Sequence, residues 1–438
     1  MKTLIISLCL IFYLTACYSQ EQKSTDWNHD IEYLKTELPK QHINLFFETS
    51  QATYLNRLSA IQADLGNLSD IQVMVKIQQV LAMMGDTHTN LYWPRNIEQN
   101  KTMGINFYWF KDGIYIVQAR EQDSLILGKK ITKIGGVDIK VAIDSIKTLF
   151  VNENTGLVKN EVPKYLSSYK ILQCFGIIDQ ENDEYVDLDL VDSKDQSLQY
   201  RLIIGTKGKQ LWANKDALYL LFGTNDWFND EYDPETHIYY LQYNKCSSKE
   251  LAMRRGIKKE KLVLLPSFNE FKQKVFKTID EKPVNKLVFD MRYNGGGTSD
   301  QGTNFINELS KIKKINNRGK LYVLVGRKTF SSAIINTLDF KEMTDAVIVG
   351  EETAGKASHF GEVKRLLLPG SGITIGYSTK YFYFNKKNEC TTFRSNNGLD
   401  VSLDKRKTVE PDDVVELSFN DYLNNVDPAK VWIENHTR

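Results

Sequence analysis

The most regular pattern of apolar and polar positions in the chain lies between residues 320 and 356. Leu321–Val325 is a continuous apolar run rich in strand-forming residues, which predicts a short buried strand. After a polar break, apolar residues recur with helical spacing from Ala333 to Leu338, so a helix is expected to begin at Ser331 or Ser332. Asp345–Gly350 predicts a second buried strand, ending in a polar turn that carries Lys356. The segment therefore predicts an α/β unit of strand, helix and strand.

The same patterns divide the rest of the chain into three regions after a leader. Residues 18–97 show helical spacing and predict a helical N-terminal domain. Residues 98–206 predict short strands, a helix and a closing hairpin, interrupted by a helical or irregular insertion at 151–182; the succession resembles a PDZ-like, β-rich domain. Residues 207–438 alternate strands with helices and predict an α/β domain.

A glycine-rich turn follows one of the strands predicted in this third region. Leu287–Asp290 is the strand, and Gly295, Gly296 and Gly297 come shortly after it. Three residues without a Cβ let backbone N–H groups approach a ligand closely. A phosphate-binding loop would end in Gly-Lys-Ser or Gly-Lys-Thr, which is missing here.

A serine at the start of a helix allows two interpretations. Unpaired N–H groups and the positive end of the helix dipole stabilise an oxyanion there, as a nucleophilic serine requires. Serine is also among the preferred N-cap residues, so either Ser331 or Ser332, taken alone, is better explained by capping.

The first residues of the chain have the pattern of an export signal. An early lysine precedes an apolar run from Leu4 to Leu14, which is too short for an ordinary membrane span. Leu14–Cys17 resembles the bacterial lipoprotein box, which implies a signal peptide over 1–17, acylation of Cys17 and a lipid anchor in the cell envelope. A plain cleaved signal with an incidental Cys17 is the alternative.

Composition narrows the range of partners. The chain has 438 residues, 42% of them hydrophobic and 25% charged, which predicts a globular protein of more than one domain. Lys+Arg number 56 against 55 Asp+Glu, so no general attraction to nucleic acid is expected. The basic residues between 254 and 261 are interpreted as solvated surface. Cys174, Cys246 and Cys390 form neither a disulfide framework nor a zinc spacing, and no metal or other cofactor is expected.

Three motifs in order resemble the tail-specific, or C-terminal processing, serine peptidases. They are Asp290–Gly297 (Asp-x-Arg-x-Asn-x-Gly-Gly in the family), the helix start at Ser331, and Gly350–Lys356, whose lysine follows Ser331 by 25 residues as in that family. Val409–Asp412 is similar to the family's closing Val-x-Pro-Asp segment, and His88 lies in a turn similar to its Asp-x-His-Thr element. The resemblance implies a crotonase-like α/β catalytic core and a membrane-tethered endopeptidase acting on extended polypeptides.

The resemblance also implies roles for individual residues. Ser331 is the nucleophile, Ser332 contributes its backbone N–H to the oxyanion hole, and the partner N–H comes from Gly296 or Gly297. Lys356 is the implied general base, and a lysine can act as a base only when desolvation keeps it neutral. His88 is the second candidate base, because tricorn-like relatives use a histidine from that position. A further candidate is His359, three residues beyond the lysine.

The chain departs from the family pattern at two positions. Ile334 replaces a glutamate three residues after the nucleophile, and Phe360 replaces a glutamine often found four residues after the lysine. Losing two polar supports favours a different function on the same fold, namely a lipoprotein that binds peptide or a small apolar ligand without cleaving it. A hydrolase of non-peptide esters fits the same residues.

Overall fold

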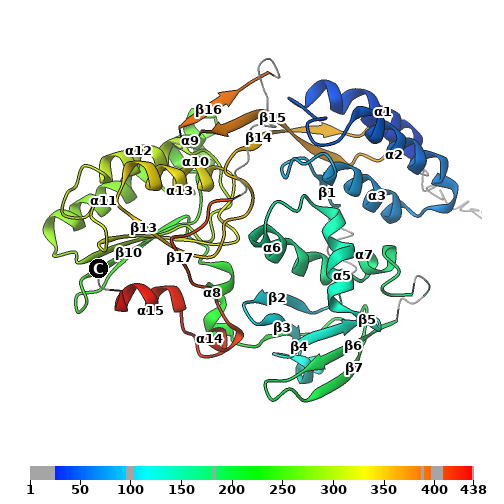
Figure 1. The fold of residues 1–438 in the computed structure, drawn as a ribbon, viewed down its shortest axis with the longest axis horizontal. Helices are drawn as coiled ribbons and strands as arrows, with labels where there is room; N and C mark the ends of the chain where they lie inside the picture. Colours follow the sequence, from blue (N-terminus) through cyan, green and yellow to red (C-terminus); the bar gives the residue numbers. More distant parts are fainter. Residues whose placement is uncertain are drawn as a thin grey trace, which may run out of the picture.

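The computed structural model describes residues 25–94, 103–179, 181, 184–385, 389–395 and 408–436. The predicted leader and Cys17 lie outside these residues. In the part of the chain that is described, no helix is long and apolar enough to cross a membrane. The described residues form a group of helices, a β-rich part and an α/β part (Figure 1).

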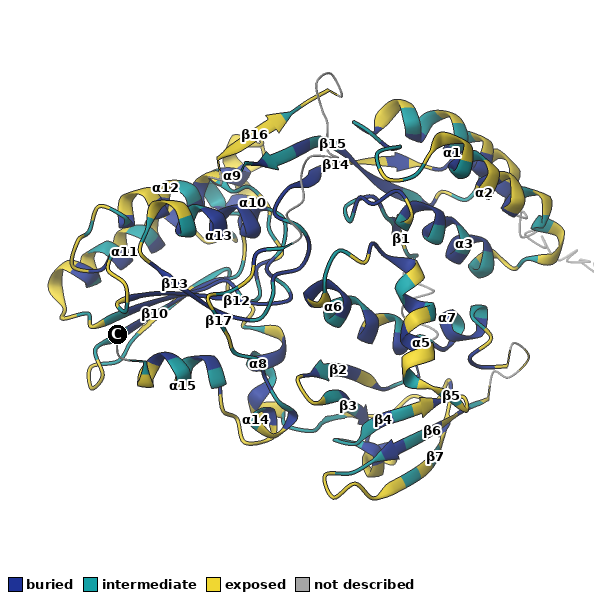
Figure 2. Cartoon of the chain, in the orientation of Figure 1, coloured by how far each residue is buried: buried dark blue, intermediate teal, exposed yellow. Residues whose placement is uncertain are grey.

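The α/β part is built on a six-stranded sheet in the order β17-β13-β12-β11-β10-β9. The strands β10 to β13 and β17 run parallel, and β9 lies antiparallel to β10 at one edge. Helices α11, α12 and α13 cover one face and α15 covers the other, so the central strands are buried on both sides (Figures 1 and 2). Their bounds are β9 Phe228–Tyr232, β10 Ile238–Tyr243, β11 Lys286–Asp290, β12 Leu321–Val325, β13 Val347–Gly350, β17 Asp413–Val414, α11 Phe268–Glu281, α12 Asp300–Leu309, α13 Ser332–Met343 and α15 Pro428–Asn435.

This topology brings the three motifs together. Asp290, Val325 and Gly350 end the adjacent parallel strands β11, β12 and β13, and they lie at nearly the same level because Asp290 pairs with Leu324 and Val325 pairs with Gly350. The loops that follow the carboxyl ends of parallel strands share one edge of the sheet, which is where α/β proteins bind their ligands. The glycine turn, Ser331 and Lys356 all belong to these loops.

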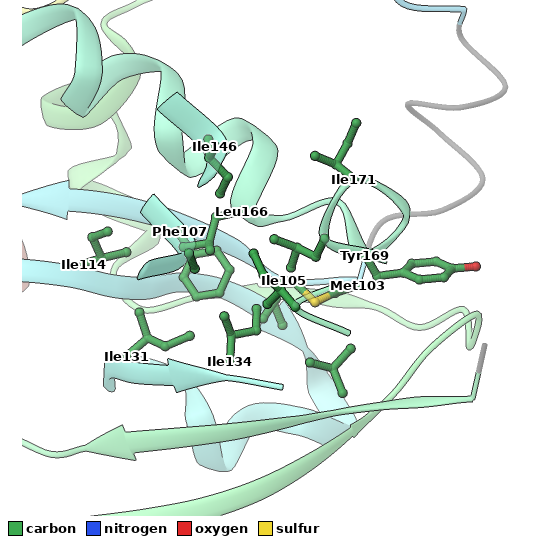
Figure 3. Packing of buried hydrophobic residues seen from close by; sticks show 14 of the residues in the cluster. Met103, Ile105, Phe107, Ile114, Ile131, Ile134, Ile146, Leu166, Tyr169 and Ile171 are labelled. Atoms are coloured by element: carbon green, nitrogen blue, oxygen red, sulfur yellow. The ribbon is translucent and has the colours of Figure 1, made fainter. Parts of the chain in front are cut away.

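The β-rich part is a seven-stranded sheet whose main path is β2-β3-β4-β6-β7, with β5 paired to β4 and β8 to β3. The insertion expected at 151–182 forms two helices, α6 and α7, which pack with α5 against the core of this sheet (Figure 3). In Figure 3, Leu166 from α6 lies beside Phe107 from β2. The bounds are β2 Asn106–Phe110, β3 Gly113–Arg120, β4 Lys130–Ile134, β5 Val137–Asp138, β6 Tyr185–Val191, β7 Ser197–Ile203, β8 Gln210–Trp212, α5 Ile139–Ile146, α6 Thr155–Leu166 and α7 Tyr169–Cys174.

The N-terminal helices complete their core with a distant segment. The long hairpin of β14 and β15 leaves the α/β part, and β15 pairs with the short strand β1 that follows α3. Leu366, Leu368, Ile373 and Ile375 of the hairpin pack with the apolar faces of α1, α2 and α3. The bounds are α1 Trp27–Gln41, α2 Gln51–Ala63, α3 Asp70–Ala82, β1 Leu91–Tyr92, β14 His359–Leu367, β15 Thr374–Phe384 and β16 Cys390–Phe393.

Two of the remaining helices, α8 and α14, pack against the β-rich sheet. Phe419 and Tyr422 of α14 pack against Phe110 and Val117 of the β-rich sheet. The bounds are α8 Leu218–Phe222, α9 Lys249–Arg254, α10 Lys259–Leu262 and α14 Phe419–Leu423.

Candidate active site

Ser331 stands at the start of α13 in a conformation that an ordinary cap does not need. Its backbone has φ 54° and ψ −123°, and its side chain makes no capping hydrogen bond. A non-glycine residue at positive φ is uncommon and costs on the order of 1–3 kcal/mol, so it persists only where the surroundings hold it. Here the N–H of Phe330 donates to the carbonyl of Asn294, 3.0 Å away, and ties the segment before Ser331 to the glycine turn. The capping interpretation of Ser331 is therefore wrong.

The glycine turn lies directly against Ser331. A Cβ on Gly296 would lie 2.9 Å from the Cβ of Ser331 and 3.0 Å from the amide nitrogen of Ser332. Both Gly296 and Gly297 have positive φ, at 98° and 140°. Only glycine combines this conformation with so close an approach.

The sequence left open whether Gly296 or Gly297 offers the second N–H donor, and the hydrogen bonds of the turn distinguish them. The N–H of Gly296 donates to Asn294 Oδ1 at 2.9 Å, so it is already engaged. On either side of Gly297, Cys246 accepts from the Thr298 N–H at 2.7 Å and donates to the Gly296 carbonyl at 3.2 Å. In the described part of the chain, the N–H groups of Gly297 and Ser332 have no acceptor. Ser332 directly follows Ser331, and the Ser332 hydroxyl donates to the Gly297 carbonyl at 2.9 Å, so both N–H groups belong to the segments that meet at Ser331. Paired donors in this position suit a developing oxyanion.

A buried arginine holds the same turn from behind. The guanidinium of Arg292 bonds to Asp290 at 2.8 Å and to Asp427 at 2.7 Å, and both carboxylates are buried. This arrangement explains the arginine and aspartate of the first motif as supports of the strand end.

His88 faces the segment that carries Ser331. Its ring stacks on that of Phe330, with centroids 4.6 Å apart and planes at 22°. Both rings line a cavity of about 180 Å³, together with Glu153, Lys356, His359 and others, whereas Ser331 itself adjoins this lining through Phe330. Among the described residues no hydrogen bond joins Ser331 to His88 or to Lys356. Catalytic hydrogen bonds of unliganded enzymes often tighten only when substrate binds.

Burial sets the protonation of His88. Its side chain is 11% exposed, and burial lowers its pKa although the charge of Asp86 acts in the opposite direction. An imidazole with a lowered pKa is neutral at pH 7 and has a lone pair with which to accept a proton.

Asp86 is a carboxylate of the cavity that is held by several hydrogen bonds. It accepts hydrogen bonds from the His88 N–H at 2.8 Å, from Thr89 Oγ1 at 2.6 Å and from His42 Nε2 at 3.0 Å. The Asn44 N–H donates to His42 Nδ1, which leaves the proton of His42 on Nε2. Burial alone would raise the pKa of Asp86, but the hydrogen bond and the charge interactions with the two histidines lower it, so the group is ionised. Its Oδ1 lies 3.9 Å from His88 Nδ1, where a negative charge stabilises an imidazolium.

His359 is a second histidine of the cavity, and its ring stacks on that of His88. The two rings stack with centroids 5.8 Å apart, and His359 Nδ1 bonds to the carbonyl of Ala357. Burial, with repulsion from His88, lowers the pKa of His359 to about 4. It lines the cavity as a neutral residue.

Lys356 points its amine toward the N-terminal helices. Its Nζ forms an ion pair with Glu48 Oε1 at 3.3 Å, and the side chain is 31% exposed. The backbone N–H of Lys356 donates to Glu153 Oε2 at 2.8 Å; burial raises the pKa of Glu153. An amine held by a carboxylate and open to water lacks the desolvated surroundings that a lysine base requires.

The two departures from the family pattern fill apolar positions. Ile334 is 1% exposed and packs with Ala357, Phe384 and Val409. Phe360 packs against the rings of His42 and Phe47, at centroid distances of 5.2 and 4.6 Å. Apolar packing thus replaces the polar supports at both positions.

Four residues of this region were not predicted from the sequence: His42, Glu48, Asp86 and Glu153. Asp86 had a visible signal, because an aspartate two residues before a histidine can accept that residue's N–H. Glu48 and Glu153 line the cavity and His42 contacts Asp86 only because distant segments pack together, so their sequence carries no such signal. In the described ranges no group of His, Cys, Asp and Glu side chains could hold a metal ion.

Comparisons with known proteins concern the fold and one segment of the sequence. Residues 300–394 match the model of Peptidase family S41. No curated protein matches the sequence. The fold is similar to that of mature CPAF, with 12% identity over 93% of this chain and 95% of that chain and a TM-score of 0.55. Mature CPAF complexed with lactacystin gives 12% identity, coverage of 93% and 96%, and the same TM-score.

A photosystem II D1 C-terminal processing protease matches at 14% identity over 89% of this chain and 93% of that chain, with a TM-score of 0.38, so the likeness in fold rests on the CPAF structures. The family match covers the segment that carries Ser331 and Lys356. Residues 300–394 thus match the model of Peptidase family S41, which confirms the predicted resemblance to the tail-specific serine peptidases over that segment. The chain as a whole has a fold similar to that of mature CPAF.

Proposed function

We propose that this chain is a serine endopeptidase that cleaves extended polypeptides. We also propose that the enzyme itself is tethered to the bacterial cell envelope by a lipid anchor. The observation that carries the proposal is Ser331, held at φ 54° at the N-terminus of α13 beside the free N–H groups of Gly297 and Ser332. The peptidase family match to residues 300–394 supports polypeptide as the substrate class.

The reaction follows from the positions of these groups. Ser331 Oγ attacks the scissile carbonyl as its proton passes to the base, and the Gly297 and Ser332 N–H groups bind the oxyanion. The base then protonates the leaving amine, and an acyl-enzyme remains on Ser331. Water, deprotonated by the same base, attacks the acyl carbon and releases the second product.

The geometry favours His88 as the base over Lys356. His88 is buried and stacks on the residue next to Ser331, and Asp86 stabilises its protonated form. Lys356 is bound to Glu48, so its contribution is to hold the N-terminal helices against the cavity. This assignment reverses the order of the two candidates inferred from the family resemblance.

Tethering through Cys17 rests on the sequence of the leader. Leu14–Cys17 fits the lipoprotein box, and acylation there would fix the peptidase at a membrane. Mass spectrometry of the mature N-terminus in the producing cell tests this part separately. An N-terminus without an acyl group on Cys17 would refute the anchor and leave the peptidase proposal intact.

Covalent labelling with a fluorophosphonate tests the nucleophile. Wild-type protein is expected to be labelled, with loss of fluoride and formation of a phosphonyl ester on Ser331. Ser331→Ala removes the labelling, whereas Ser332→Ala, which keeps the backbone N–H and changes only the hydroxyl, retains labelling within about tenfold. Labelling that survives Ser331→Ala would contradict the assignment. Folded wild-type protein that is never labelled would favour the non-cleaving lipoprotein.

A further inference from the structure

A short helical hairpin on the α/β part exposes an unusual amount of apolar surface. The hairpin, residues 249–264, consists of α9, α10 and the residues around them (Figure 1). Val263 and Leu264 are 79% and 84% exposed, and Met253 and Ile257 are 58% and 44% exposed. Single exposed apolar residues are ordinary on protein surfaces, but four within twelve consecutive residues are a patch that needs an explanation.

These apolar residues play no part in holding the hairpin in place. Other side chains of the hairpin, Leu251, Ala252 and Leu262, are buried and pack it onto the domain. The Glu250 carboxylate also receives a hydrogen bond from the Phe268 N–H at 3.1 Å, at the start of α11. The patch is thus presented on a fixed support and is free to contact a partner.

Basic residues surround the patch. They are Arg254, Arg255, Lys258, Lys259 and Lys261, all exposed, and the single acidic residue from 251 to 264 is Glu260. Arg255 donates to Thr298 Oγ1 at 2.6 Å, and the other four cations form no ion pair within the described residues. The partner must therefore offer negative charge and an apolar interior together.

We propose that the hairpin docks on the surface of an anionic phospholipid bilayer. Lysine and arginine approach the lipid phosphates while Val263, Leu264 and Met253 enter the boundary between headgroups and acyl chains. A second copy of the chain fits poorly, because a symmetric contact would place the two cation clusters against each other. Nucleic acid would leave the four aliphatic side chains in water, and the exposed part of the hairpin has no aromatic side chain on which a base could stack.

Docking here has a consequence for the candidate active site. Thr298, which receives the hydrogen bond from Arg255, directly follows Gly297 of the proposed oxyanion hole. The bilayer would lie close to the site, so polypeptide segments near the membrane surface would be the accessible substrates. The docking inference itself stands on exposure and charge and does not depend on the peptidase proposal.

Vesicle binding tests the inference. The chain from residue 25 onward is used, because the apolar leader would itself bind lipid, and every described residue is retained. Co-sedimentation is measured with vesicles of phosphatidylglycerol and phosphatidylcholine mixed in equal amounts and with vesicles of phosphatidylcholine alone. Wild-type protein is expected to bind the anionic vesicles at least tenfold more strongly, with binding that weakens as salt is raised.

Variants locate the surface. V263D/L264D and K258E/K259E are each expected to lower the partition coefficient by tenfold or more, since each cation near an anionic surface contributes roughly fivefold. Leu125→Asp is the matched control: Leu125 is 62% exposed but lies outside the hairpin, in a segment whose acidic residues Glu121 and Asp123 pair with Lys209 and Arg120, and the variant should bind like wild type. Circular dichroism verifies that each variant is folded.

Three outcomes would overturn the inference. The first is wild-type protein that does not bind anionic vesicles, and the second is binding that both hairpin variants leave unchanged. The third is a concentration-dependent dimer in sedimentation velocity that V263D/L264D abolishes while vesicle binding stays at wild-type strength, which would assign the hairpin to a second copy.

Discussion

Replacing Gly297 by alanine should abolish most of the activity without unfolding the protein. A Cβ at this position would lie 2.2 Å from the carbonyl oxygen of Cys246, whereas ordinary contact begins at 3.4 Å. The backbone must therefore move by about 1 Å or more, and φ 140° is itself unfavourable for alanine. An oxyanion donor works only within about 2.7–3.1 Å of the oxyanion, so this movement removes the Gly297 N–H from the hole. The expected loss in kcat is about 10²–10³-fold, or about 2.7–4 kcal/mol.

The neighbouring glycine provides a matched control. Gly295 has no positive φ, and a Cβ there would meet no atom within 4 Å, so Gly295→Ala should keep kcat within about twofold. The assay is hydrolysis of a chromogenic ester with kcat and KM measured separately, alongside the rate of fluorophosphonate labelling and the melting temperature. The oxyanion-hole assignment would be refuted if folded Gly297→Ala kept kcat within about threefold of wild type. Equal losses in both variants would likewise show that the glycine turn acts only through stability.

The remaining predictions concern the base and the arginine support. Because burial lowers the pKa of His88, the acid limb of kcat/KM should have its midpoint below the ordinary histidine value of about 6.5, and activity should fall as the pH drops through it; a midpoint above pH 8, or full activity of His88→Gln, would rule this histidine out. Arg292→Met leaves the buried carboxylates of Asp290 and Asp427 without a counter-charge and should cost about 3–5 kcal/mol in urea unfolding. Arg201→Met, which breaks an exposed ion pair with a carboxylate, should leave the urea midpoint close to that of wild type, and similar losses in both variants would contradict the role given to burial.

Much of the α/β part could be predicted because its signals are local. Leu321–Val325 forms β12 with the predicted bounds, and Val347–Gly350 forms β13 within the predicted run, since continuous apolar stretches of this length suit strands buried on both faces. The glycines at 296 and 297 do occupy positive φ, and Gly296 approaches Ser331, as a ligand-binding turn requires. These features depend on residue type and spacing over a few positions.

Other features had no local signal. The hairpin of β14 and β15 completes the core of the N-terminal helices, although more than 250 residues separate it from them. The alternation of apolar and polar residues in its strands is that of any half-buried hairpin. The sequence therefore does not indicate which surface the hairpin covers. The basic residues near 254–261, interpreted as solvated, acquire a different meaning once the structure exposes Val263 and Leu264 beside them.

The sequence by itself predicted the strands at 321–325 and 345–350, the helix that begins at Ser331 or Ser332 and the glycine turn, because each follows from residue type and periodicity along the chain. The proposed nucleophile, Ser331, came from the resemblance of three motifs to a known family. Only the tertiary structure decided which groups lie near Ser331. It engaged the Gly296 N–H with Asn294 and left that of Gly297 free, stacked His88 on Phe330, and paired Lys356 with a glutamate 308 residues away. Such contacts depend on how distant segments pack, and the desolvation and pairing that decide a side chain's chemistry exist only after that packing.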